Sequence, residues 1–224
     1  IAQSGEVTGP ELNIFRAPIE NDNHYKKGWK AANLNQLTEK VISIQSEQVN
    51  KSLVAVNIVK EFKSDSITFT HECTYNITGK GQITLKNKVT PTGGKSLETL
   101  PRMGIKLGLV QGLENVNWYG RGPQENYPDR NESAFLGNYQ STVTDLFTPY
   151  IVPQENGARS DVRTLALSFK NRKKPSIKVN ASKPFIFSAL HYDALDLIKA
   201  SRPAFLKDRK ETILCLDAKM LGLG

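Results

Sequence analysis

Carboxylates are the residues of this sequence that could most directly do chemistry. The candidates lie in one stretch rich in Gly, Pro and aromatic residues and are Glu125, Asp129, Glu132, Glu155 and Asp161. Glycoside hydrolysis needs two carboxyl groups on opposite sides of the bond, one as the acid and the other as the nucleophile or base. Two of these side chains could face one cleft and supply that pair.

The same carboxylates also have a structural interpretation. Glu125 and Glu155 each occupy the centre of a Gln-Glu-Asn triplet, with Arg121 near the first triplet and Arg159 and Arg163 near the second. Carboxylates and guanidinium groups form strong hydrogen-bonded pairs. The sequence favours this interpretation, in which both glutamates are ion-paired structural residues.

Other reaction types find little support. The three histidines are His24 in a polar loop, His71 on the apolar face of an alternating run, and His191 before a helix-like segment. His71 is predicted to be a core residue. No Gly-x-Ser-x-Gly turn exists for a nucleophilic serine, and residues 120–122 lack the third glycine and the lysine of a phosphate loop.

Composition fits a globular chain. The 224 residues are 38% hydrophobic and 23% charged, which suffices for a core. The net charge of +8 is scattered, and its densest cluster, residues 171–175, is predicted to be a solvated hairpin tip rather than a nucleic-acid contact. No apolar run reaches the roughly 18 residues of a membrane span. Cys73 and Cys215 lie far apart in apolar runs and are predicted to be buried free thiols without zinc-ligand spacing.

Alternation with a period of two predicts most of the elements that hold these residues. Five runs alternate, within residues 67–77, 83–89, 105–109, 165–169 and 185–189. Such strands, joined by Gly, Pro and Asn turns, predict antiparallel sheets packed as a sandwich. Residues 193–200 predict one short helix before Pro203, and residues 90–95 predict a turn or short linker within a single domain. Alternation fades over residues 117–163, which are predicted to be long loops suited to binding.

Four blocks carry a family resemblance. Residues 118–130 (WYGRGPQENYPDR) resemble the signature of the C-terminal domain of family 2 β-galactosidases. Residues 149–163, 15–22 with Trp29, and 216–224 are similar to further blocks of that domain, in the family's order. The first block usually reads Arg-Ala-Pro-Thr-Asp-Asn-Asp, whereas Ile19 and Glu20 replace its Thr-Asp here.

The resemblance implies an all-β fold, a large antiparallel supersandwich of the galactose mutarotase type, over residues 1–224. Its members are multidomain enzymes that hydrolyse terminal β-D-galactosides, lactose included, with retention. Their two catalytic glutamates lie in an upstream (β/α)₈ barrel, so no residue of this chain is expected to be catalytic. The last strands of the sandwich and a sugar-stacking tryptophan are expected beyond residue 224, which makes this a fragment truncated at its C-terminal side.

The resemblance also implies roles for individual residues. A loop after the first block reaches the active-site entrance in the family, and by position it corresponds here to residues 21–27. Asn21, Asp22, His24 and Tyr25 of this loop are expected to border the substrate. The remaining motif residues are expected to be structural: Trp118, Arg121, Gln124, Glu125, Asn126, Tyr127, Asp129, Arg130, Gln154, Glu155, Asn156, Arg159 and Arg163.

Partners follow from the same resemblance. The chain is expected to contact the catalytic barrel and the other domains of its parent, and a galactoside, but neither nucleic acid nor membrane. No cofactor or metal is expected in this chain, whereas the parent is expected to hold Mg and a monovalent cation such as Na in its other domains and to form homo-oligomers. The bacterial cytoplasm and periplasm both stay open as compartments.

Two alternatives are kept beside this reading. A stand-alone carbohydrate-binding module would stack sugars on Trp118, Tyr119 or Tyr127, although a buried position for Trp118 is favoured. A mutarotase-like epimerase would use His24 or His71 with Glu155 as its base and acid.

Overall fold

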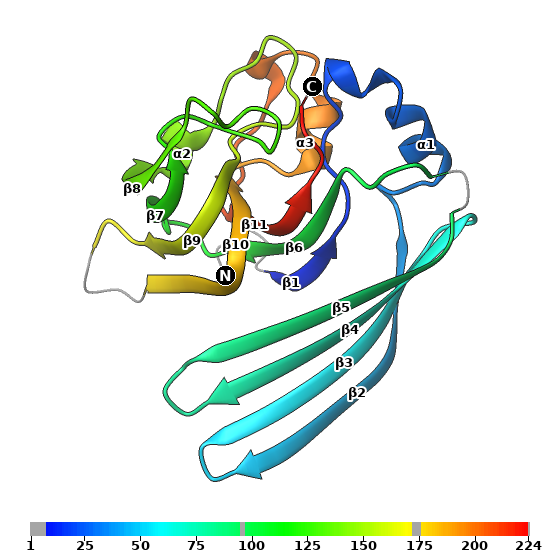
Figure 1. Ribbon diagram of the computed structural model, residues 1–224, viewed down its shortest axis with the longest axis vertical. Helices are drawn as coiled ribbons and strands as arrows, with labels where there is room; N and C mark the ends of the chain where they lie inside the picture. Colours follow the sequence, from blue (N-terminus) through cyan, green and yellow to red (C-terminus); the bar gives the residue numbers. More distant parts are fainter. Residues whose placement is uncertain (1–7, 95–96, 172–175, 224) are drawn as a thin grey trace. The chain divides into compact units, whose positions relative to one another are not determined.

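The chain folds into two units, each built on one antiparallel sheet. The computed structural model describes residues 8–94, 97–171 and 176–223. One unit combines the residues up to Lys26 with those from Thr99 onward, and the other comprises residues 27–98 (Figure 1). The all-β class and the antiparallel pairing predicted from alternation are confirmed, while the supersandwich arrangement stays a prediction.

The larger unit contains a seven-stranded sheet in the order β1-β6-β11-β10-β9-β7-β8. Every neighbouring pair in this sheet is antiparallel. Its strands are β1 (Thr8–Asn13), β6 (Arg102–Leu109), β7 (Asn115–Gly122), β8 (Phe135–Thr142), β9 (Arg159–Ser168), β10 (Ser176–Leu190) and β11 (Thr212–Met220). This order places β6, from the middle of the chain, between the first described strand and the last one.

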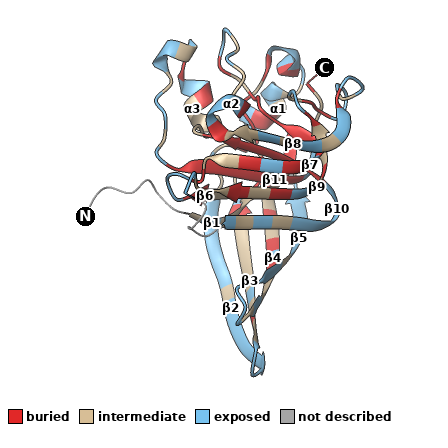
Figure 2. Cartoon of the chain, turned by 90° about the vertical axis from the view of Figure 1, so that its left-hand side faces the viewer, coloured by how far each residue is buried: buried red, intermediate tan, exposed pale blue. Residues whose placement is uncertain are grey.

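The smaller unit is a four-stranded meander with consecutive strands side by side. Its strands are β2 (Thr38–Asn50), β3 (Leu53–Lys63), β4 (Ile67–Thr78) and β5 (Ile83–Gly93). Phe69 of β4 lies opposite Phe62 of β3, so the apolar residues of both strands share one face. The edge strand β2 is exposed along nearly its whole length, and Figure 2 shows the contrast with the buried centre of the seven-stranded sheet.

The core of the seven-stranded unit is centred on Trp118. This indole is 3% exposed and meets Phe187 edge-on at 5.7 Å between ring centroids. Its Nε1–H donates to the carbonyl of Arg121 at 2.9 Å, so the polar atom is satisfied inside the core. Leu165, Leu167 and Leu214, all buried, belong to the same cluster.

A bulge in β9 shapes the end of this core. The pairing of β9 with β10 shifts between Val162 and Arg159, and Asp161 between them has φ +51°. A left-handed conformation costs a non-glycine residue roughly 1–2 kcal/mol, and bulges of this kind re-aim the side chains around them. Across the sheet, Gly120 lies so close to Val162 that an added Cβ would be 2.7 Å from Cγ2 and 2.8 Å from Cα.

The helices differ from the sequence prediction. The predicted segment forms α3 (Ala194–Lys199) with Asp193 as its N-cap. The prediction of a single helix is wrong. The structure also contains two further α-helices and two 3-10 turns, namely α1 (Lys26–Ala31), α2 (Val143–Leu146), η1 (Glu20–Asn23) and η2 (Pro203–Phe205). None of these helices, within the ranges that the structure describes, is long and apolar enough to cross a bilayer.

Two boundaries also differ. Residues 90–95 were predicted to form a turn or linker, but β5 continues to Gly93, so the prediction is wrong for residues 90–93. Lys95 lies outside the described residues. The stretch 117–163 contains most of β7, all of β8 and the start of β9, so only residues 123–134 and 147–158 form long loops. Residues 172–175 of the predicted hairpin tip lie outside the described residues, although the flanking strands β9 and β10 do pair.

Cys73 and Cys215 are buried and free, as predicted.

The close approach of β7 and β9 predicts a strong side-chain restriction at position 120. Gly120→Ala should destabilise the fold by about 1–3 kcal/mol, because the new methyl group meets the backbone of Val162. Gly9→Ala is the matched control, since nothing lies within 4 Å of its added Cβ. Urea unfolding of both variants measures the effect, and equal stabilities for the two would contradict this account of the close approach.

Candidate functional site

Two loops, residues 123–134 and 147–158, carry most of the predicted motif residues. Asn126 connects them through hydrogen bonds of its backbone and its side chain. Its N–H donates to the carbonyl of Ala158 at 2.9 Å. Its side-chain oxygen accepts from both the N–H of Ser160 at 2.9 Å and the hydroxyl of Ser160 at 2.6 Å. Because Asn126 is 1% exposed, these bonds satisfy polar atoms that water cannot reach.

The repeated Gln-Glu-Asn triplet forms the same local bond in each loop. Asn126 Nδ2 donates to the carbonyl of Gln124 at 3.0 Å, and Asn156 Nδ2 donates to the carbonyl of Gln154 at 2.9 Å. Each asparagine thereby closes a turn onto its own backbone two residues earlier. The central glutamate of each triplet is left to bind a partner from elsewhere.

Glu125 binds three donors. Its Oε1 accepts from Arg130 Nη2 at 2.9 Å and from the hydroxyl of Tyr150, while its Oε2 accepts from the N–H of Gly157 at 2.7 Å. The predicted ion pairing of this carboxylate is confirmed, but the partner is Arg130 rather than Arg121. Burial, followed by the hydrogen bond to Glu125, raises the pKa of Tyr150.

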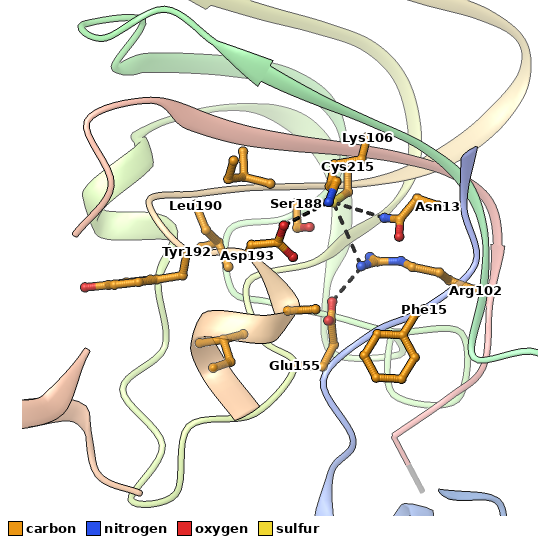
Figure 3. A pocket seen from close by; sticks show the side chains of 13 residues that line it. Asn13, Phe15, Arg102, Lys106, Glu155, Ser188, Leu190, Tyr192, Asp193 and Cys215 are labelled. Atoms are coloured by element: carbon orange, nitrogen blue, oxygen red, sulfur yellow. Dashed lines mark hydrogen bonds and ion pairs between the residues drawn. The ribbon is translucent and has the colours of Figure 1, made fainter. Parts of the chain in front are cut away.

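Glu155 belongs to a buried cluster on the sheet. Its Oε1 lies 3.3 Å from Arg102 Nη2 (Figure 3). The same nitrogen lies 2.8 Å from Asp217 Oδ2. The partner predicted from sequence, Arg159 or Arg163, is therefore wrong. All three side chains are at most 5% exposed, so one guanidinium compensates two carboxylates away from water.

Arg159 and Arg121 both bind backbone carbonyls of the loops. Arg159 donates to Pro123 at 3.0 Å and to Gly157 at 2.9 Å, and burial lowers its pKa to about 10. Arg121 bridges Asp161 Oδ2 at 2.6 Å to the carbonyl of Ala134 at 2.9 Å. These bonds fix the ends of both loops on the strands.

The other motif residues also have local partners. Arg163 donates to the carbonyl of Asp161, and its guanidinium lies over the Tyr119 ring. Gln124 Nε2 donates to the carbonyl of Ser133 at 2.9 Å, and Gln154 Nε2 to that of Val152 at 3.2 Å. The expected structural role of these residues agrees with such contacts and stays an expectation.

A cavity adjoins the Glu155 cluster. It is lined by charged residues that are already paired, Arg102 with Glu155 and Lys106 with Asp193, and by Cys215 (Figure 3). Its free volume of about 20 Å³ admits one water molecule. Small-molecule sites usually offer about 300–1,000 Å³, so this cavity does not hold a sugar.

The aromatic residues divide between core and surface. Trp118 and Tyr127 are 3% and 0% exposed, which confirms the buried position favoured for Trp118. Burial raises the pKa of Tyr127, whose hydroxyl accepts from the N–H of Ala158. Tyr119 is 39% exposed and is the one residue of these three that a ligand could reach.

The loop that follows the first block is held by a buried ion pair between Arg16 and Asp22. Arg16 Nη2 donates to Asp22 Oδ1 at 2.9 Å, and the N–H of Ile19 donates to Asp22 Oδ2 at 2.9 Å. Asp22 is 2% exposed, so its carboxylate faces the protein rather than a ligand. Asn21 and His24 are exposed, and Tyr25, half-buried, contacts the His24 ring edge-on. Of the four predicted substrate neighbours, the structure leaves these three accessible.

The two residues of the first block that depart from the family pattern, Ile19 and Glu20, differ in their exposure to solvent. Ile19 is buried in a cluster with Tyr127, Ile186 and Met220, whereas Glu20 is exposed at the start of η1.

His71 and His191 each bind a local partner. His71 is buried with Nε2 2.8 Å from Asn87 Oδ1, as predicted for a core residue, although its Nδ1 has no hydrogen-bond partner within the described residues. His191 is half-buried between Glu114 and the carbonyl of Glu211. Across the ranges that the structure covers, no group of three or more His, Cys, Asp or Glu could hold an ion.

The smaller unit has a polar groove of about 360 Å³ at the start of β2. Lys40, Glu61, Lys63 and Asp65 are among its lining residues, which include no aromatic side chain. Ligand sites are mostly apolar and aromatic, so this groove lacks a surface on which a sugar could stack.

Three buried charged residues were missed by the sequence predictions. Arg16 and Asp217 lie within the recognised blocks, so that resemblance was an available signal. Arg102 is 115 residues from its partner Asp217, and no local sequence pattern predicts such a pair.

The Glu155 cluster predicts a pH dependence of stability. Burial raises the pKa of Asp217 to about 6, with Glu155 adding to the rise and Arg102 opposing it. The folded protein therefore holds this proton more tightly than the unfolded chain. The group stabilises the fold below about pH 4, and this contribution is lost as the pH rises through about 6.

Asp217→Asn should remove that dependence. The stability of the unsubstituted protein minus that of the variant should fall by roughly 2 kcal/mol from about pH 4 to about pH 7. Urea unfolding across this range measures it, with the exposed Glu132→Gln as control. A difference independent of pH would contradict the raised pKa.

Comparison with known proteins places this arrangement in a family. Residues 2–224 match the family model described as beta galactosidase small chain. A β-galactosidase from Vibrio cholerae is 33% identical over 223 residues, covering 95% of this chain and 21% of the relative. A β-galactosidase from Actinobacillus pleuropneumoniae is 32% identical, covering 96% of this chain and 20% of the relative. The chain thus spans about a fifth of the length of the curated relatives that it matches, and it belongs to the β-galactosidase small-chain family.

Proposed function

We propose that this chain is a non-catalytic domain of a β-galactosidase that hydrolyses terminal β-D-galactosides, lactose included, with retention. In this proposal both catalytic glutamates belong to a barrel elsewhere in the polypeptide. The chain buttresses that barrel and lends residues 21–25 to the active-site entrance.

The observation that carries the proposal is the engagement of Glu125 and Glu155. A retaining glycosidase needs two carboxyl groups about 5–5.5 Å apart that both reach the sugar. Glu125 already accepts from Arg130, Tyr150 and Gly157. Glu155 is held by Arg102 beside a cavity with room for one water molecule. Neither carboxylate is placed to attack or protonate a glycoside.

The relatives support the identity of the parent enzyme. The matched proteins from Vibrio cholerae and Actinobacillus pleuropneumoniae are named β-galactosidases and are about five times as long as the matched region. The proposal assigns Mg, a monovalent cation such as Na, and the contacts of a homo-oligomer to the other domains of such a parent.

Two competing functions have weaker support in the geometry. For a carbohydrate-binding module, Trp118 and Tyr127 are buried and cannot stack on a sugar. For a mutarotase-like epimerase, His71 is buried beside Asn87 and Glu155 is paired with Arg102. His24 is exposed and is the one candidate base of that reading within reach of a ligand.

The proposal predicts that the purified chain does not hydrolyse a chromogenic β-galactoside. The measurement compares the release of the chromophore with that in buffer and in the Glu125→Gln and Glu155→Gln variants. All four rates should agree, because the reacting carboxylates are absent from this chain. Hydrolysis that either substitution abolishes would refute the proposal, and tight binding of galactose in a parallel titration would favour the binding module.

A further inference from the structure

Residues 221–223 contact two loops, the first-block loop (residues 21–25) and the loop 123–134, which is called the motif loop below. They follow β11 and are 200 residues from Asn21 and more than 90 from Asp129. The N–H of Leu221 donates to the carbonyl of Pro101 at 2.9 Å, which fixes the start of the segment beside β6.

On one side, the segment is held by the first block. Arg16, 0% exposed, donates to the carbonyls of Leu221 at 2.6 Å and Gly222 at 3.0 Å. Asn21 Nδ2 donates to the carbonyl of Leu223 at 2.9 Å. Because Arg16 also binds Asp22, a single guanidinium connects the segment to the residues on which the loop 21–25 rests.

On the other side, the segment is held by Asp129. The N–H of Leu223 donates to Asp129 Oδ1 at 3.0 Å. Gly222 lies directly against this carboxylate, since an added Cβ would be 2.2 Å from Asp129 Cγ. The contact therefore requires both the acid at 129 and the missing side chain at 222.

Apolar contacts close the same three-way junction. Leu223 and Met220 are buried in one cluster with Ile19 of the first block and Tyr127 of the motif loop. Asn21, Asn23 and His24 are exposed, although Asn21 also binds Leu223. The first-block loop is thus anchored through Asp22 and Asn21 and still presents polar side chains to solvent.

From this junction we infer that Asp129 is a positioning residue for loop 21–25, acting through the backbone of residues 222–223 and Asn21. This inference rests on the proposed function, in which the loop borders the galactoside. Small displacements of groups that contact a substrate cost binding and rate, so loss of the Asp129 contact should weaken substrate binding without touching the reacting atoms.

The test breaks the contact from both sides in the complete β-galactosidase. Asp129→Ala removes the acceptor of the Leu223 N–H, and Gly222→Ala drives the segment away from the carboxylate. Glu132→Ala is the matched control, because it makes a comparable truncation at an exposed position of the same loop. Asn21→Ala serves as a milder variant should the others fail to fold, since it removes one bond at the surface.

Hydrogen exchange of the amides of residues 21–25 is the first readout. It should accelerate roughly five- to tenfold in Asp129→Ala and in Gly222→Ala, as expected for the loss of one hydrogen bond, and should not change in Glu132→Ala. The double variant should show less than the combined effect, because removal of the carboxylate opens the space for the new methyl group. Unchanged exchange in all contact variants would overturn the inference.

Kinetics with a β-galactoside is the second readout. KM should rise several-fold with a smaller change in kcat, as expected when binding common to ground and transition states is lost. Accelerated exchange with unchanged KM would overturn the link between the loop and the substrate. A complete protein without any β-galactosidase activity would refute the proposed function instead, and the exchange measurement would still decide whether Asp129 positions the loop.

Discussion

A guanidinium buried away from water requires carboxylate or carbonyl partners, and this requirement organises the seven-stranded unit. Arg16 binds Asp22 and two backbone carbonyls, Arg102 binds Asp217 and Glu155, and Arg159 binds carbonyls of both motif loops. Removing one partner from such a group leaves an uncompensated charge, which typically costs about 3–5 kcal/mol. The positions of the loops are thus set by buried charge as well as by apolar packing.

Charged groups that stabilise the fold in this way cannot also serve in catalysis. A glutamate that stabilises an arginine in a closed cluster cannot also approach a substrate, and a catalytic acid needs a pKa near the working pH together with access to the reacting atom. Under the proposed function the two demands are met by different parts of one enzyme. The loops described here then contribute rigidity, while the exposed side of residues 21–25 faces the substrate.

The five alternating runs of the sequence correspond to β4, β5, β6, β9 and β10, because their signal is local, whereas β2, β3, β7 and β8 were not predicted. Alternation over residues 67–77 corresponds to β4, and the capped segment after Asp193 corresponds to α3. The missed helices are short: α1 has six residues with Gly28 inside it, and α2 has four, too few for a periodic pattern.

The pairing of charged side chains could not be predicted in the same way. The expected partners of Glu125 and Glu155 were arginines close in sequence. Glu125 does bind such an arginine, Arg130 instead of Arg121, whereas Glu155 binds Arg102, 53 residues away. Strand order decides such contacts: β6 lies beside β11, which brings Arg102 to Asp217 across 115 residues. The resemblance identified the blocks in which the important residues lie, but not which residues meet.

The exposed edge strand β2 has a consequence for work on the chain by itself. Along its 13 residues, one row of backbone N–H and C=O groups has no neighbouring strand in the part of the chain that the structure describes. Val41, Ile44 and Val49 are 47%, 63% and 48% exposed along it. Open edges of this length are templates for a strand from another molecule. Purified alone at high concentration, the chain would tend to self-associate through this edge, so its solution properties would need to be measured over a dilution series.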